Sequence, residues 1–159
     1  MEAGELLVRG TACAAFLLYV VALLKRRLSW WAAGCVLFWV HVACAFQWVH
    51  HWSHNAAFEE TAKQTLAATG FNSGFGLYLN YAFMLVWAGD ALWWSHMREA
   101  YFSRSKVIAS LIHGFMAFMW FNATIVFGHG FARWLGVAAL AWLGFTWMRQ
   151  VWHPGRRRG

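Results

Sequence analysis

Long apolar runs, separated by short polar segments, dominate the pattern of this chain. Each run is close to the roughly 20 residues that a helix needs to cross a hydrocarbon core about 30 Å thick. The runs are apolar around the whole helix rather than along one stripe, which is typical of membrane spans and not of soluble helices. The pattern predicts an all-α integral membrane protein, a bundle of five transmembrane helices over residues 6–24, 28–49, 76–95, 107–127 and 132–151.

The connections between the predicted spans are short, with one exception. KRRLS joins the first two spans and GHGF joins the last two, so each pair should consist of antiparallel neighbours. The exception is the loop of residues 50–75, where apolar residues recur at helical spacing and Gly70 is a suitable helix stop. We expect a short amphipathic helix over residues 56–69, lying at the outer surface between spans two and three.

The composition and the placement of charge fit a single membrane domain over residues 1–159. Of these residues 61% are hydrophobic and 12% are charged, and the net charge is +7. With the N-terminus outside, ten basic residues fall on the cytoplasmic side and three fall outside or at the outer boundary. This bias predicts an N-out, C-in orientation, in the cytoplasmic (inner) membrane of a bacterium. It explains the basic residues through the lipid bilayer, without nucleic acid as a partner.

Histidines crowd the end of the second apolar run, in the stretch HHWSHNAAFEE that begins at His50. One protonated histidine is enough to offset the partial negative charge of a helix C-terminus, and here His50, His51 and His54 lie within five residues. If the second span continues outward as a helix, spacings of three and four residues place them on one face. The alternative is an ordinary polar helix end at the water boundary.

Further ligand types lie near this stretch. His129 ends the fourth predicted span on the same side of the membrane, and Glu59 or Glu60 can fold back toward the histidines. Imidazoles with a carboxylate suit Cu, Zn or non-haem Fe. A boundary haem b between His129 and one of the first two histidines is a further option. The sequence therefore predicts an outer-face metal or haem site, with no cofactor as the alternative.

Polar residues inside the spans form two predicted layers. Asp90, the only acid within a span, and His113 both lie roughly 10 Å from the cytoplasmic side, which predicts an Asp90–His113 pair. In the outer half His41, Asn80 and Asn122 lie within about two helical turns of one another in depth. Such layers fit interhelical hydrogen bonds that fix the packing, or a proton or ion path.

Three functional classes follow. The first is a subunit of a larger redox- or metal-associated membrane assembly that uses the histidine-rich site. The second is a proton- or ion-transport element centred on Asp90 and His113. The third is a structural subunit without a cofactor. The small soluble mass and the many bulky aromatic residues favour assembly as a homo-oligomer or with other membrane subunits. The sequence assigns no catalytic residue, so enzymatic activity stays open.

Overall fold

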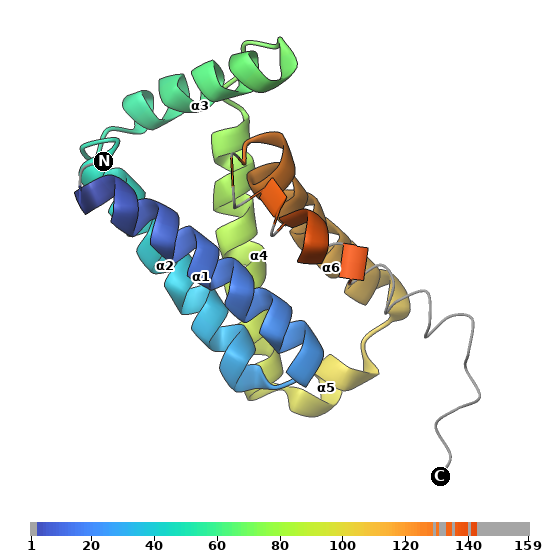
Figure 1. Cartoon of the computed structure of the whole chain (residues 1–159). Helices are drawn as coiled ribbons and strands as arrows, with labels where there is room; N and C mark the ends of the chain where they lie inside the picture. Colours follow the sequence, from blue (N-terminus) through green and yellow to red (C-terminus); the bar gives the residue numbers. More distant parts are fainter. Residues whose placement is uncertain (1–2, 129, 131–132, 135, 140, 143–159) are drawn as a thin grey trace. The chain divides into compact units, whose positions relative to one another are not determined.

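The structure is a computed structural model that describes residues 3–128, 130, 133–134, 136–139 and 141–142. It is 86% helical, and the described residues contain no strand, so the all-α prediction is confirmed. The predicted span 132–151 lies largely outside the described residues. The elements are α1 (Ala3–Lys25), α2 (Leu28–Trp48), α3 (His54–Thr69), α4 (Gly76–His96), α5 (Arg98–Ser103), α6 (Lys106–Phe121) and the π-helical turn η1 (Asn122–Val126) (Figure 1).

The chain divides into two compact units, Met1–Met119 and Trp120–Gly159. The first unit contains α1 to α5 and most of α6. In the second unit the buried Thr124 donates a hydrogen bond from its hydroxyl to the carbonyl oxygen of Trp120, at 2.7 Å. A Cβ atom at Gly136 would overlap the Thr124 side chain, so glycine is what allows the backbone to approach it closely.

Within the part of the chain that the structure describes, three helices are long and apolar enough to cross a membrane: α1, α2 and the continuous helical segment Lys106–Val126. Helix α4 coincides with the third predicted span but is not among them. Its sequence includes Asn80, Asp90 and several tyrosines and tryptophans, which lower its mean hydropathy. Three membrane-crossing helices are therefore consistent with the structure, while the five-span count and the orientation stay predictions.

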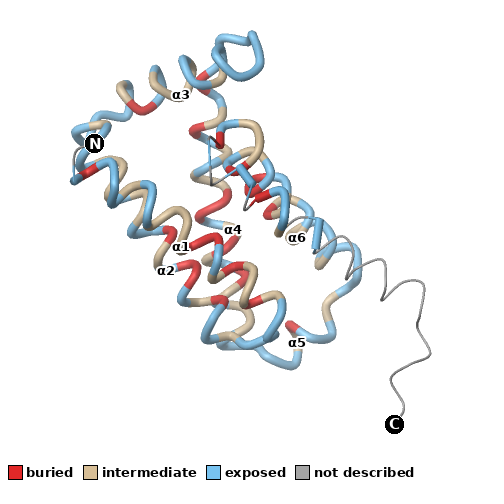
Figure 2. Tube along the Cα trace, in the orientation of Figure 1, coloured by how far each residue is buried: buried red, intermediate tan, exposed pale blue. Residues whose placement is uncertain are grey.

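Aromatic contacts show how the helices of the first unit are arranged. The ring centroid of Trp31 in α2 lies 5.6 Å from that of Tyr19, 5.5 Å from that of Trp87 and 5.8 Å from that of His113. These four rings therefore share one level, which is about 5–14 Å from the end of α1, the start of α2, the end of α4 and the start of α6. Along the series α1, α2, α4 and α6, each helix thus runs opposite to the one before it. Buried positions lie where these helices meet (Figure 2).

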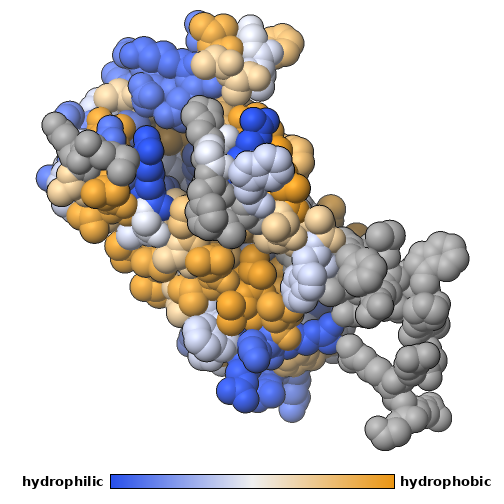
Figure 3. Space-filling model, in the orientation of Figure 1, coloured by the Kyte–Doolittle hydropathy of each residue, from blue (hydrophilic) through white to orange (hydrophobic). Residues whose placement is uncertain are grey.

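Large apolar side chains stay exposed on the other faces of these helices. Val36 is 64% exposed, Leu85 66% and Leu111 69%, although each lies well inside a helix. Figure 3 shows a hydrophobic band on the visible face, with hydrophilic residues toward the ends of the helices. A band of this kind fits lipid or a protein partner better than water.

The connection between α2 and α3 breaks the helix at the histidine stretch. His51 and Trp52 adopt positive φ angles of 49° and 58°, and the Trp52 N–H closes the turn by donating to the Phe46 carbonyl, at 3.0 Å. The Ser53 hydroxyl then accepts a hydrogen bond from the Ala56 N–H and caps α3. Helix α3 ends at Thr69, and the following Gly70, with a φ of 80°, caps it as predicted.

Candidate functional site

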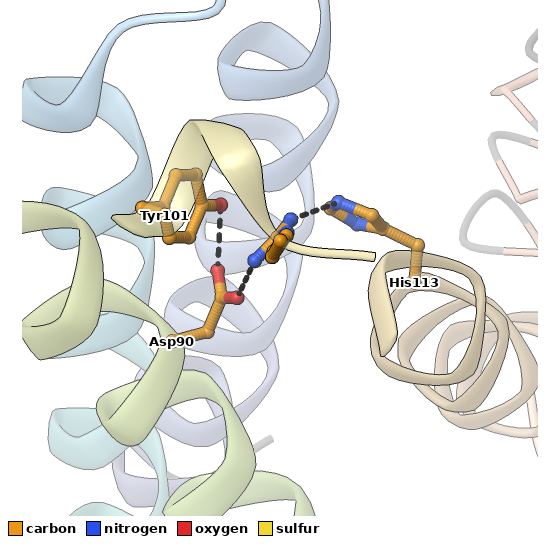
Figure 4. Close-up of polar contacts among 4 residues, drawn as sticks. Asp90, Tyr101 and His113 are labelled. Carbon is orange, nitrogen blue, oxygen red and sulfur yellow. Dashed lines mark hydrogen bonds and ion pairs between the residues drawn. The ribbon is translucent and has the colours of Figure 1, made fainter. Parts of the chain in front are cut away.

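The only carboxylate buried among the described residues is that of Asp90, in the second half of α4. Its side chain is 0% exposed, and each of its oxygens accepts one hydrogen bond. Arg104 Nη1 donates to Oδ1 at 2.6 Å, and the Tyr101 hydroxyl donates to Oδ2 at 3.0 Å (Figure 4). Two donors, one of them charged, offset much of the cost of removing this carboxylate from water.

Arg104 is the centre of the cluster. Its side chain is only 8% exposed, and its guanidinium carbon lies 3.9 Å from the centroid of the Tyr101 ring and 5.8 Å from that of the Trp93 ring. The planar guanidinium group therefore combines an ion pair with aromatic stacking, a pairing that lysine could not reproduce in the same geometry.

Tyr101 fixes the carboxylate from the other side. Its ring stacks on Trp94, with centroids 5.0 Å apart and ring planes 9° apart, so its hydroxyl has a defined direction. Burial and then the negative charge of Asp90 raise the pKa of Tyr101 to about 12. Tyr101 is therefore a hydrogen-bond donor at any physiological pH.

His113 completes the cluster from α6. Its Nε2 atom lies 3.3 Å from Arg104 Nη2, and a guanidinium can only donate, so Nε2 must accept and Nδ1 must hold the proton. The buried Nδ1 has no hydrogen-bond partner among the described residues. The ring packs edge-on against Trp31, which fixes the depth of α6 relative to α2.

Local backbone structure brings these residues together. Helix α4 ends at His96, and Met97, with φ −131° and ψ 56°, directs the chain into the short helix α5. Arg104 then adopts an extended backbone, with ψ 149°, and the Ser105 hydroxyl accepts a hydrogen bond from the Ile108 N–H at the start of α6. This compact reversal folds α5 back over the end of α4, so its residues reach Asp90.

The structure differs from the predicted Asp90–His113 pair in the partner of each residue. Both residues reach the same cluster, but the Arg104 guanidinium lies between them and contacts each (Figure 4). Sequence reasoning assigned Arg104 to orientation alone and did not single out Tyr101. The sequence did contain a signal for this contact. Asp90 within a span needs a counter-charge, and Arg104 lies in the connection that follows its helix.

The arrangement limits what this cluster can do chemically. A guanidinium carries hydrogen-bond donors and no acceptor, so Arg104 cannot accept a proton from one of its two partners and relay it to the other. The ion pair, the stacked rings and the bond to His113 instead tie α4, α5 and α6 together. The geometry is that of a structural clamp.

The histidine stretch has a different arrangement. Because α2 ends at Trp48 and α3 begins at His54, the continuous helix that would place His50, His51 and His54 on one face does not form. The His50 ring packs against Phe46, with centroids 5.5 Å apart, and His51 is exposed. The one-face arrangement is therefore wrong, because the capped turn interrupts the helix.

The third histidine of the stretch faces two tyrosines of α4. His54 Nδ1 lies 3.2 Å from the Tyr81 hydroxyl oxygen, and its Nε2 lies 3.5 Å from that of Tyr78. His54 and Tyr78 are exposed, and Tyr81 is half-buried. These contacts attach the start of α3 to α4 and engage both ring nitrogens of His54.

Of the remaining predicted ligands, Glu60 lies near enough to His50 for its negative charge to oppose the lowering of that ring's pKa by burial. Glu60 accepts a hydrogen bond from Gln64 at 3.1 Å, Glu59 is exposed on α3, and His129 lies outside the described residues. Within the described part of the chain, no group of three histidine, cysteine or acidic side chains is placed to hold a metal ion.

For the predicted outer layer of His41, Asn80 and Asn122, the structure shows the partners of His41. His41 Nδ1 lies 2.9 Å from the Val8 carbonyl oxygen and 3.4 Å from the Thr11 hydroxyl, so its partners are in α1. Asn80 is exposed on α4, and Asn122 belongs to the second unit. His41 therefore contributes to the α1–α2 pair rather than to a contact with Asn80.

Comparison of the chain with protein-family models, curated proteins and solved structures gives no match.

Proposed function

We propose that this chain is a structural subunit of a larger membrane assembly, with five spans and an N-out, C-in orientation. The observation that supports it best is the contrast between buried polar groups and exposed apolar ones. Asp90 is 3% exposed, whereas Leu85 and Leu92 on the same helix are 66% and 59% exposed. A helix of this kind faces its own bundle with its charge and faces lipid or a partner with its leucines.

The buried cluster supports a structural role rather than transport. An ion pair that excludes water and holds three helices fits a packing function, and Arg104 interrupts any direct proton transfer between Asp90 and His113. In this proposal the clamp fixes the exposed apolar faces in one geometry. Those faces then present a constant surface to neighbouring subunits.

The test has two parts. Membranes that contain the full chain are washed with alkaline carbonate, and a reporter that is active only in the cytoplasm is fused after Gly159. We expect the chain to stay in the membrane and the reporter to be active; an extracted chain or an inactive reporter contradicts the topology. The purified protein is then sized in a mild detergent. Migration as a lone monomer, with no partner retained, contradicts the assembly.

A metal or haem site at the histidine stretch is the second proposal. It is supported by the two neighbouring histidines, His50 and His51, in one short connection, with an exposed carboxylate at Glu59 nearby in the sequence. Metal analysis and an oxidised-minus-reduced visible spectrum of protein purified without chelator or histidine tag test it. A Soret band selects haem, and stoichiometric Cu, Zn or Fe selects a metal centre. If the protein shows neither a Soret band nor a stoichiometric metal, the proposal is contradicted.

A further inference from the structure

Exposed basic side chains gather at one end of the first unit. The turn between α1 and α2 contains Lys25, Arg26 and Arg27, and the connection from α4 to α6 contains Arg98 and Lys106. All five residues are exposed. The ring contacts at the level of Trp31 place both connections at the same end of the helices, and Figure 1 shows the α1–α2 turn and α5 there.

These five positive charges outnumber the acidic ones at their end of the described part of the chain. None of them forms an ion pair there, and the acid beside them in the sequence, Glu99, is itself exposed. The opposite end of the unit is different, because Arg9 and Lys63 are accompanied by Glu5, Glu59 and Glu60. The basic end therefore carries an excess of positive charge that anions from outside the protein can neutralise.

Exposed apolar side chains accompany the basic ones. Leu24 and Trp30, which flank the first basic group, are 48% and 41% exposed. Met97, Phe102 and Val107, near the second group, are 58%, 63% and 67% exposed. A phospholipid presents the matching pair of chemistries, a phosphate beside an acyl chain, whereas a soluble anion matches the charges alone.

We propose that this basic end, defined by Lys25, Arg26, Arg27, Arg98 and Lys106, binds the headgroups of anionic phospholipids. The inference rests on the proposed membrane location and names the lipid class that the protein selects there. Each basic residue near an anionic surface should strengthen binding about fivefold, and added salt should weaken it.

The test compares two short-chain lipids, dioctanoyl phosphatidylglycerol and dioctanoyl phosphatidylcholine, each titrated into the full chain in mild detergent. Binding is followed by intrinsic tryptophan fluorescence and by the thermal unfolding midpoint. We expect the anionic lipid to bind at least about tenfold more tightly than the zwitterionic one. Equal binding overturns the proposal. Glycerol 3-phosphate is the third ligand, and binding as tight as that of the anionic lipid overturns the lipid assignment.

Matched variants locate the effect. Arg26→Gln/Arg27→Gln should weaken binding of the anionic lipid by at least about tenfold, because two charges are lost at the basic end. Arg9→Gln/Lys63→Gln removes the same charge at the opposite end and should change binding by less than about twofold. Arg26→Lys/Arg27→Lys should restore most of the affinity.

Equal losses in the two glutamine variants overturn the proposal, as does a lysine variant that binds no better than the glutamine one. Helix content measured by circular dichroism shows that each variant is folded. Failure of the proposed membrane function appears separately, as a chain that carbonate extracts from membranes. Failure of the lipid proposal leaves an inserted protein with no lipid preference.

Discussion

The two polar regions of the first unit, the Asp90 cluster and the histidine stretch, contrast in how their residues meet. Asp90, Tyr101, Arg104 and His113 come from α4, α6 and the connection between them, yet each contacts another at 3.3 Å or less. The histidines lie within five residues of one another, yet the turn between α2 and α3 separates their environments. Proximity in the sequence therefore did not produce a cluster, whereas helix packing did.

The contrast extends to burial and thus to energy. The Asp90 carboxylate is sealed from water, so the loss of Arg104 leaves an uncompensated charge and the loss of the Tyr101 hydroxyl leaves an unsatisfied oxygen. The histidine contacts lie at the surface, where water replaces a lost partner at little cost. Mutations in the first region should affect the whole fold, and mutations in the second should act locally.

The largest effect should follow removal of the buried carboxylate. Asp90→Ala leaves the Arg104 guanidinium buried without a counter-charge and should lower the free energy of unfolding by about 3–5 kcal/mol. The double variant Asp90→Leu/Arg104→Leu should lose less than the single variant, because an apolar pair needs no compensation. Unfolding in mild detergent, followed by circular dichroism, measures both. A double variant that loses as much stability as Asp90→Ala, or more, would show that the two residues do not act as a pair.

A smaller effect should follow removal of the tyrosine hydroxyl. Tyr101→Phe keeps the stack on Trp94 but removes the donor to Asp90 Oδ2, and should cost about 1–3 kcal/mol of stability. Tyr78→Phe is the control, because it makes the same substitution but removes a hydroxyl that lies at the surface. The same unfolding assay compares them. A loss in Tyr78→Phe as large as that in Tyr101→Phe would remove the distinction between the two regions.

The same tyrosine predicts a loss of stability at high pH. Burial and the charge of Asp90 raise the pKa of Tyr101 to about 12, above the ordinary value of about 10. Its contribution is therefore fully present below about pH 10 and is lost as the pH rises through about 12. Unfolding midpoints across this range, for the wild type and Tyr101→Phe, should converge. Parallel curves would contradict the prediction.

The histidine that binds α4 should have only a local effect. His54→Ala removes the contacts to Tyr78 and Tyr81 and should cost less than about 1 kcal/mol. Ser53→Ala, which removes the helix cap, should cost about 1 kcal/mol. In both variants hydrogen exchange should become faster in α3 and stay unchanged in α1 and α2. Faster exchange throughout the unit would place His54 in the core instead.

The smallest effect concerns the protonation of His50. Burial lowers the pKa of His50, the charge of Glu60 opposes this shift, and repulsion from His51 lowers the pKa by a smaller amount. Its small contribution to stability is therefore present above about pH 6.5 and declines as the pH falls below that value. Histidine NMR titration should give a midpoint below about 6.5. Glu60→Gln should lower this midpoint further, and an increase would contradict the assignment.

Helix positions were predictable to a large extent, and side-chain partners were not. Apolar runs of about 20 residues closely predicted the positions of α1, α2, α4 and the segment formed by α6 and η1. Gly70 predicted the end of α3. Both signals are local in the sequence. The buried acid was identified from its depth alone. The sequence did not identify Arg104 as the partner of Asp90, because a basic residue in a connection is explained equally well by the orientation of the chain in the membrane.

The sequence by itself determined the helical class and the need of Asp90 for compensation, because hydropathy and the cost of burying a charge do not depend on the details of packing. Only the tertiary structure decided which residues bind the Asp90 carboxylate. The one-residue break at Met97 folds α5 back over α4 and brings Tyr101 and Arg104 onto the carboxylate. Packing likewise decided that His54 contacts two tyrosines. The turn before it places His51 and Trp52 at positive φ, a conformation that non-glycine residues adopt only where the surrounding contacts hold them in it.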